Sequence, residues 1–217
     1  MIKPVVLTLD FDWCDDEVLK YTLHKLITNK VPATFFVTHV TDLLEEIRKY
    51  NFFELGIHPN FSDKSTHGNN YKDVISHCLS IVPEAKSSRS HGLHISSNIL
   101  TYMSTQGIMI DSSIFMPNIT NFKNFSFEVD NKNILRIPYN WEDDYEFYQK
   151  YKKYKFSDIN QYKTLIMDFH PIHVYLNSNS TEEYEKYKNG KEYSCSKSEG
   201  AESIFDEVIE EYKKGNI

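Results

Sequence analysis

The 217-residue sequence lacks an excess of positive charge and any long apolar run, and each absence excludes a class of protein. Its formal charge of −7 disfavours a nucleic-acid partner, because such proteins gather Lys and Arg on one face to bind phosphates. No stretch approaches the roughly 20 apolar residues that a membrane helix needs, so we expect no membrane insertion. Residues 1–4 lead straight into a strand-like segment without a signal-peptide core, which predicts a cytoplasmic protein.

Cysteine is also scarce. Cys14, Cys78 and Cys195 are widely separated, odd in number and without a C-x-x-C pair, which excludes a disulfide framework and a thiolate zinc site. We expect them to be reduced packing residues. Any metal would have to be held by His and carboxylate side chains, which suits a catalytic site better than a closed structural one.

Short apolar runs alternate with amphipathic stretches along the chain. Residues 5–9 and 33–37 predict strands that are buried on both faces, and the apolar spacing over residues 15–29 predicts a helix between them. The same alternation continues to the end of the chain. The further expected elements are helices over 41–50, 71–82, 96–106 and 201–213, strands over 52–57, 86–92, 107–111 and 165–169, and a hairpin of 125–129 with 134–137.

This alternation predicts one α/β domain over residues 1–217, with parallel strands and the hairpin as an insertion. Residues 177–198 are polar, and we expect them to form a mobile connection before the closing helix. Enzymes built on parallel sheets place their chemistry at the carboxyl ends of the strands. The acids, histidines and arginine of this chain repeatedly follow its expected strands.

Asp10 and Asp12 close the first expected strand, and His58 closes the third. Two carboxylates at this spacing project to the same side of a strand, so one can bind a cation while the other binds a proton. An acidic entry to the following helix is the alternative explanation of the pair. Imidazole and carboxylate together form an ordinary ligand set for zinc and related ions, with His67, Asn60 and His91 as candidates for the third position.

Several short strings in this order resemble the polysaccharide deacetylases of NodB homology, which are similar to carbohydrate esterase family 4. They are TLDFD (8–12), ATFFV (33–37), HPNF (58–61), RSHG (89–92) and FHP (169–171). More narrowly, the chain is similar to the WbmS-like branch, which is associated with bacterial surface-polysaccharide gene clusters. The strings that carry this likeness are ELGIHPNF (54–61), STHG (65–68), PYNWEDD (138–144) and FHPIHVYLN (169–177).

The resemblance implies a distorted (β/α) barrel of the NodB type and a set of residue roles. Asp10 would be the general base, held by Arg89, and His170 would be the general acid. Asp12 and His58 would bind a divalent ion, with Zn²⁺ the first choice and Co²⁺, Ni²⁺, Mn²⁺ or Fe²⁺ as alternatives. Such an ion lowers the pKa of bound water from about 15.7 to about 7, which gives a nucleophile at neutral pH.

The chain departs from the family pattern at the third metal ligand. The common pattern has a second histidine four residues after the first, and Ser62 stands there in this sequence. We therefore expect His67 to be the third ligand, because the intervening loop can fold back. His91 is the second choice and Asn60 the third.

An acidic residue orients the catalytic histidine in this family. Glu142, Asp143 and Asp144 are the candidates, and we slightly favour Glu142. Trp141 and Tyr139 can form an apolar wall for a sugar ring, although aromatic residues beside a proline are as often part of the core. The residues expected to contact substrate are Asn60, His91, Trp141 and Glu142.

The resemblance thus implies a metal-dependent amide hydrolase that removes an acetyl group from an N-acetylated sugar or glycan precursor. The resemblance places this reaction in the biosynthesis of surface polysaccharide, such as lipopolysaccharide or O-antigen. Two alternatives remain. One is a deformylase or another C–N amide hydrolase on the same scaffold, and the other is an inactive carbohydrate-binding protein that has lost a ligand at Ser62.

Overall fold

The computed structural model describes residues 5–129, 132–190 and 198–217. Its strands join one nine-stranded sheet in the order β6-β7-β5-β4-β3-β2-β1-β9-β8. Every strand pair is parallel except the β6–β7 hairpin. The strands are β1 (Val5–Asp10), β2 (Ala33–Val37), β3 (Phe53–Ile57), β4 (Ser87–Ser88), β5 (Ile110–Asp111), β6 (Phe125–Val129), β7 (Lys132–Arg136), β8 (Trp141–Glu142) and β9 (Leu165–Phe169).

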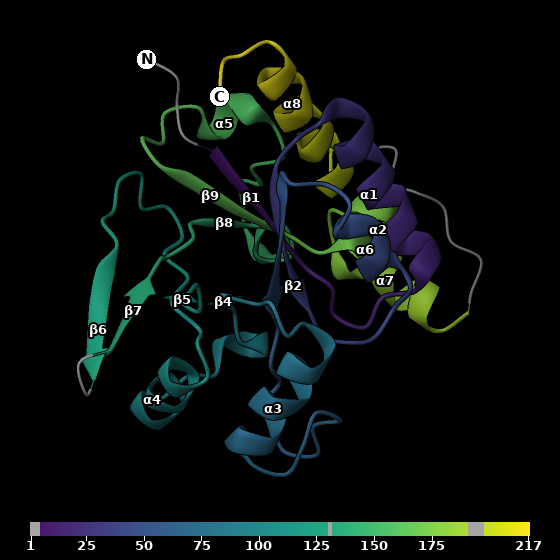
Figure 1. Ribbon diagram of the computed structural model, residues 1–217. Helices are drawn as coiled ribbons and strands as arrows, with labels where there is room; N and C mark the ends of the chain where they lie inside the picture. The colour runs from purple at the N-terminus through teal and green to yellow at the C-terminus, as the bar shows by residue number, and fades with distance from the viewer. Residues whose placement is uncertain (1–4, 130–131, 191–197) are drawn as a thin grey trace.

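The sheet curls into a half-barrel, which confirms the expected NodB-type α/β scaffold. Helices α1, α2, α6, α7 and α8 gather on one side, α3 and α4 lie below the middle strands, and the β6–β7 hairpin stands apart (Figure 1). The helices are α1 (Asp16–Asn29), α2 (Leu43–Ile47), α3 (Tyr71–Ile81), α4 (Ser97–Thr105), α5 (Phe156–Ile159), α6 (Pro171–Leu176), α7 (Thr181–Lys188) and α8 (Ala201–Lys213), with 3₁₀ turns η1 (His91–Leu93) and η2 (Tyr145–Tyr148).

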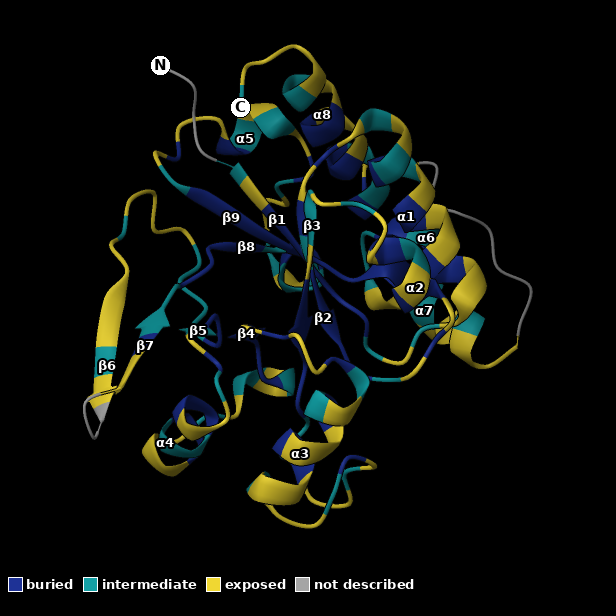
Figure 2. Cartoon of the chain, viewed as in Figure 1, coloured by how far each residue is buried: buried dark blue, intermediate teal, exposed yellow. Residues whose placement is uncertain are grey.

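Burial explains why these segments form these elements. The central strands are buried along most of their length, whereas the helices bury one face and expose the other (Figure 2). The closing helix α8 buries Ile204, Phe205, Val208 and Ile209 at helical spacing against the core. In the described part of the chain, no helix is both long enough and apolar enough to cross a membrane.

The structure corrects one expectation and leaves others outside its range. Residues 181–188 form α7, although the sequence predicted a mobile connection there. The helix buries none of its residues fully, and only Tyr184 and Tyr187 pack partly against the core, so its apolar period is too weak to predict it. Cys195 and residues 1–4 lie outside the described residues, while Cys14 and Cys78 are free thiols.

Candidate functional site

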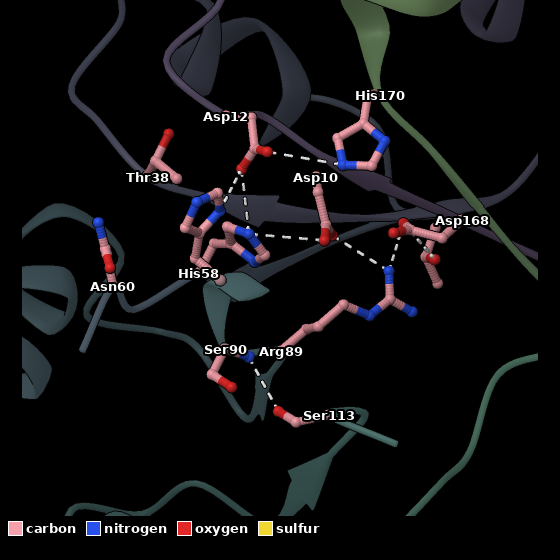
Figure 3. A network of polar contacts seen from close by, with 12 residues as sticks. Asp10, Asp12, Thr38, His58, Asn60, Arg89, Ser90, Ser113, Asp168 and His170 are labelled. Carbon is pink, nitrogen blue, oxygen red and sulfur yellow. Dashed lines mark hydrogen bonds and ion pairs between the residues drawn. The ribbon is translucent and has the colours of Figure 1, made fainter. Parts of the chain in front are cut away.

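The side chains expected to carry chemistry meet at one edge of the sheet. Asp10 ends β1, His58 follows β3, Arg89 follows β4 and His170 follows β9. These strands are parallel, so their carboxyl ends lie at the same edge and point their side chains toward one another (Figure 3). Residues 160 positions apart in the sequence thereby share one site.

Asp12, His58 and His91 form a group of possible metal ligands whose ligand atoms all lie within 4.8 Å of one another. Asp12 Oδ1 is 3.1 Å from His58 Nε2 and 3.0 Å from His91 Nδ1. Burial on its own would raise the pKa of Asp12, but hydrogen bonds from His58 and His91 outweigh it and hold that pKa well below its usual range. One ionised carboxylate and two imidazole nitrogens fit a zinc-type ion.

Backbone contacts between two loops bring the imidazoles of this group together. The His91 amide donates to the carbonyl of Pro59 at 3.0 Å, which joins the loop after β4 to the loop after β3. The Ser90 amide donates to Ser113 Oγ at 2.8 Å and fixes the same loop from its other side. These two backbone hydrogen bonds place His91 next to Asp12. The number of residues between His58 and His91 does not reveal this contact.

Among the described residues, His67 is not grouped with Asp12 and His58. Its Nδ1 accepts a hydrogen bond from the Asn60 amide at 3.1 Å, and its ring stacks on His77 with centroids 5.1 Å apart. Burial lowers the pKa of His67 to about 4, so the ring is neutral and braces its own loop. The geometry thus favours His91, the second choice from the sequence, as the third ligand.

Asn60 likewise serves the loop that contains it. Its side-chain oxygen accepts a hydrogen bond from the Ser62 amide at 2.9 Å, which is a local turn contact. Figure 3 shows its side chain to one side of the cluster, with no contact drawn to the other labelled residues. Its predicted contact with substrate stays a prediction.

Arg89 is fully buried and lies between two carboxylates. Its Nη1 donates to Asp10 Oδ1 at 3.1 Å and to Asp168 Oδ1. The guanidinium is also held between the rings of Phe36 and Tyr139, 4.6 and 4.2 Å from their centroids. Arg89 therefore contacts Asp10 as expected, and Asp168 shares the same guanidinium.

His170 is oriented by Asp143. His170 Nδ1 lies 2.7 Å from Asp143 Oδ1, and the His170 amide donates to Asp143 Oδ2 at 2.8 Å. Burial would lower the pKa of His170, but the charge and hydrogen bond of Asp143 outweigh it and raise that pKa well above its usual value. Nε2 then faces Asp12 Oδ2 at 3.6 Å, so a protonated His170 can donate toward the space beside the proposed ligands.

Glu142, the favoured candidate from the sequence, does not hold this position. Its Oε1 accepts a hydrogen bond from the Tyr139 hydroxyl at 3.3 Å, and burial raises its pKa to about 8. β8 ends at Glu142. The chain turns at the following residue, so that the carboxylate of Asp143 faces His170. A strand of two residues is too short to show an alternation of buried and exposed side chains. The sequence therefore does not reveal where β8 ends and the turn begins.

Trp141 lies in the core rather than at a substrate surface. Its side chain is 2% exposed, packs on Phe169 with centroids 4.8 Å apart, and donates through Nε1 to the carbonyl of Lys153. Tyr139 is also buried and stacks on Phe115. The structure thus agrees with the alternative that aromatic residues beside Pro138 are core residues.

Sequence reasoning missed the residues that enclose the space in front of His170. A cavity of about 370 Å³ extends from Asp12 and His170 to the surfaces of η2 and α7. One signal for α7 was available, because Ser180 and Glu183 form an S-x-x-E capping pattern. Ser180 Oγ accepts from the Glu182 amide at 3.2 Å and donates to Glu183 Oε2 at 2.8 Å. Ser180 thus caps the helix, although these contacts are not the two reciprocal backbone bonds of a capping box.

A family model and a solved structure that match this chain agree on one family. The model of the WbmS-like polysaccharide deacetylase family matches residues 7–188. A structure of WbmS from Bordetella bronchiseptica, described as a polysaccharide deacetylase involved in O-antigen biosynthesis, is 29% identical with a TM-score of 0.81, over 96% of this chain and 90% of that one. No curated protein matches the sequence.

Two more distant structures share the fold. A protein from Mycobacterium smegmatis, described as a polysaccharide deacetylase, is 13% identical with a TM-score of 0.56, over 98% of this chain and 92% of that one. The peptidoglycan N-acetylglucosamine deacetylase Bc1960 is 14% identical with a TM-score of 0.51, over 99% and 86% of the two chains. At these identities the likeness concerns the scaffold alone.

Proposed function

Because the chain belongs to the WbmS-like polysaccharide deacetylase family, we propose that it hydrolyses the acetamide of an N-acetylated sugar by a metal-dependent reaction. The Bordetella protein that it resembles is described as taking part in O-antigen biosynthesis, which supports a surface polysaccharide or its precursor as substrate. The observation that carries the proposal is the convergence of Asp12, His58 and His91 beside Asp10 and His170.

Asp12, His58 and His91 would hold a divalent ion, with Zn²⁺ as the first choice for two imidazoles and one carboxylate. When bound, such an ion acidifies water and polarises an amide carbonyl. Asp10 Oδ2 lies 3.5 Å from His58 Nε2, so the second carboxylate of the pair stands next to the proposed ligands without being counted among them. Since Asp12, His58 and His91 would supply the metal ligands, the Asp10 carboxylate remains for proton transfer.

Asp10 would accept the proton of the attacking water, and Arg89 would fix the direction of the Asp10 carboxylate. His170 would give its Nε2 proton to the amide nitrogen as the carbon–nitrogen bond breaks, since Asp143 keeps the imidazole protonated. The new carbon–oxygen bond yields acetate, and the sugar leaves with a free amine. Both proton transfers occur within the same cluster of buried side chains.

Metal content tests the ligand set directly. Purified protein dialysed against Zn²⁺ should retain about one ion per chain by elemental analysis, and Asp12→Asn and His91→Ala should each lose it. His67→Ala is the matched control, because it removes a nearby buried imidazole that is outside the group. Retention by Asp12→Asn or His91→Ala, or loss confined to His67→Ala, would contradict the assignment.

Acetate release from a panel of N-acetylated sugars tests the reaction. Metal-loaded wild type should release acetate, whereas Asp10→Asn and His170→Ala should keep the metal and lose most turnover, by about 10²-fold or more. Formate release from N-formyl sugars without acetate release would favour the deformylase alternative. Sugar binding with no product from any member of the panel would favour the inactive binding protein.

A further inference from the structure

The cavity in front of His170 is larger than the acetamide on which the reaction acts. Its volume of about 370 Å³ lies at the lower end of the range found for small-molecule sites. Asp12 and His170 line one end, whereas the loop after β1, η2 and α7 line the remainder. The aromatic members of the lining are Trp13, Phe147, Tyr148, Tyr184 and Tyr187.

Four of these rings make contacts of their own, and Tyr148 is left open to solvent. Trp13 packs on His67 and His91, and Phe147 packs edge-on against His173. The Tyr184 ring packs edge-on against His173 with centroids 5.6 Å apart, and the Tyr187 hydroxyl donates to Asp15 at 2.8 Å. Tyr148 is 77% exposed at the cavity wall. Rings held in place before binding lose little conformational freedom and give the cavity its shape, while the open face of Tyr148 suits the apolar C–H face of a sugar.

The charged groups of the cavity disfavour an anionic occupant. Away from the catalytic end, the lining carries the carboxylates of Asp15 and Glu185 against the ammonium of Lys188, and a further carboxylate, Asp144, lines the cavity beside His170. Like charges repel across a partly enclosed space, where solvent screening is weaker than in bulk water. Carboxylates instead accept hydrogen bonds from sugar hydroxyls and attract the ammonium formed by deacetylation.

We propose that this cavity is a subsite for an uncharged sugar ring that is joined to the acylated sugar. The inference rests on the proposed deacetylase function and adds the chemistry of the neighbouring unit. Tyr148 supplies the open stacking face, and Glu185 contributes to the exclusion of anions. A phosphate carried by the glycan precursor would lie outside this cavity.

Binding of defined probes to the metal-loaded full-length chain tests the subsite. Calorimetry should show tighter binding of the neutral disaccharide N,N′-diacetylchitobiose than of N-acetylglucosamine or its 1-phosphate. Tyr148→Ala should weaken disaccharide binding about fivefold and leave the monosaccharide unchanged, because only the second ring is stacked. Tyr151→Ala is the matched control, since Tyr151 is equally 77% exposed but is not part of the cavity lining.

A second pair of variants tests the exclusion of anions from the cavity. Glu185→Gln should improve binding of the 1-phosphate about twofold, whereas Glu182→Gln, an exposed glutamate on the same helix outside the lining, should not. The subsite is refuted if no neutral disaccharide binds, if the phosphorylated sugar binds most tightly, or if Tyr148→Ala and Tyr151→Ala behave alike. These readouts measure binding, so they stand apart from a failure to release acetate.

Discussion

At the scale of single residues, the contact between Asp143 and His170 has the clearest catalytic consequence. Asp143→Asn preserves the size of the side chain but removes the charge that keeps the imidazole protonated. We expect kcat for acetate release to fall about 10²-fold, the scale of a general acid's contribution, with metal content unchanged. Steady-state kinetics and elemental analysis of the same preparation measure the two effects.

Glu142→Gln is the control for this prediction, because Glu142 was the better candidate from the sequence. Burial raises the pKa of Glu142 to about 8, so it is mostly protonated at neutral pH and glutamine replaces it with a neutral group of similar shape. We expect its kcat to stay within about threefold of wild type. A large loss in Glu142→Gln with little change in Asp143→Asn would reverse the assignment.

The residues that follow strand ends could be located from the sequence, whereas their contacts could not. Asp10, Asp12, His58 and His170 each follow a buried apolar run, so their shared edge could be predicted from the parallel arrangement. Arg89 follows the two serines of β4, where the strand signal is weaker. The third proposed ligand, His91, is brought to the site by the hydrogen bond from its backbone amide to the Pro59 carbonyl, which joins two loops. Local spacing does not encode contacts of that kind.

At the scale of elements, the buried strands and amphipathic helices were predictable, and the short β4, β5 and α2 fall within predicted segments. The short elements β8 and α6 and the polar helix α7 were not predicted. β9 is a continuous buried run and α8 has a helical apolar period, while β8 has two residues and α6 has six. For α6 a usable signal was Pro171 at the first helical position, directly after the strand. α7 has only two partly buried tyrosines on one face, so its capping residues were the stronger signal for it.

The same capping contact yields a prediction about α7. Because the helix buries none of its residues, Ser180 should matter more to it than a cap matters to a packed helix. Ser180→Ala should cost about 1 kcal/mol locally and speed amide exchange of residues 181–188 about fivefold. Hydrogen exchange measured by mass spectrometry checks this, and unchanged exchange in α7 would contradict it.

Ser96→Ala provides the matched comparison for the capping prediction. Ser96 Oγ accepts a hydrogen bond from the Ile99 amide at the start of α4, whose buried residues anchor that helix independently of its cap. We expect a smaller increase in exchange there and none in α7. An equal effect of both substitutions on α7 would indicate global destabilisation instead.

At the scale of the whole molecule, the sheet order brings distant parts of the chain to one edge. β1 lies between β2 and β9, so the first strand pairs with one that begins at Leu165. β3 and β4 follow on the other side and carry His58 and Arg89. A ligand held by Asp12, His58 and His91 would therefore link the loops after β1, β3 and β4.

This arrangement predicts that a bound ion stabilises the fold as well as the site. An ion at about 100 times its dissociation constant adds about 2.7 kcal/mol to the free energy of unfolding, provided that it binds only the folded state. For a chain of this size the gain corresponds to a rise in Tm of about 5 to 10 °C. Thermal unfolding with EDTA and with increasing Zn²⁺ measures the shift.

Two variants assign that shift to the proposed ligands. Asp12→Asn should abolish it, because the carboxylate that both imidazoles contact is lost. His67→Ala should start from a lower Tm, since a buried ring has been removed from its contact with His77, and still show the full rise with Zn²⁺. A wild-type Tm that does not depend on zinc, or a rise that persists in Asp12→Asn, would show that the three loops are not joined by an ion at this site.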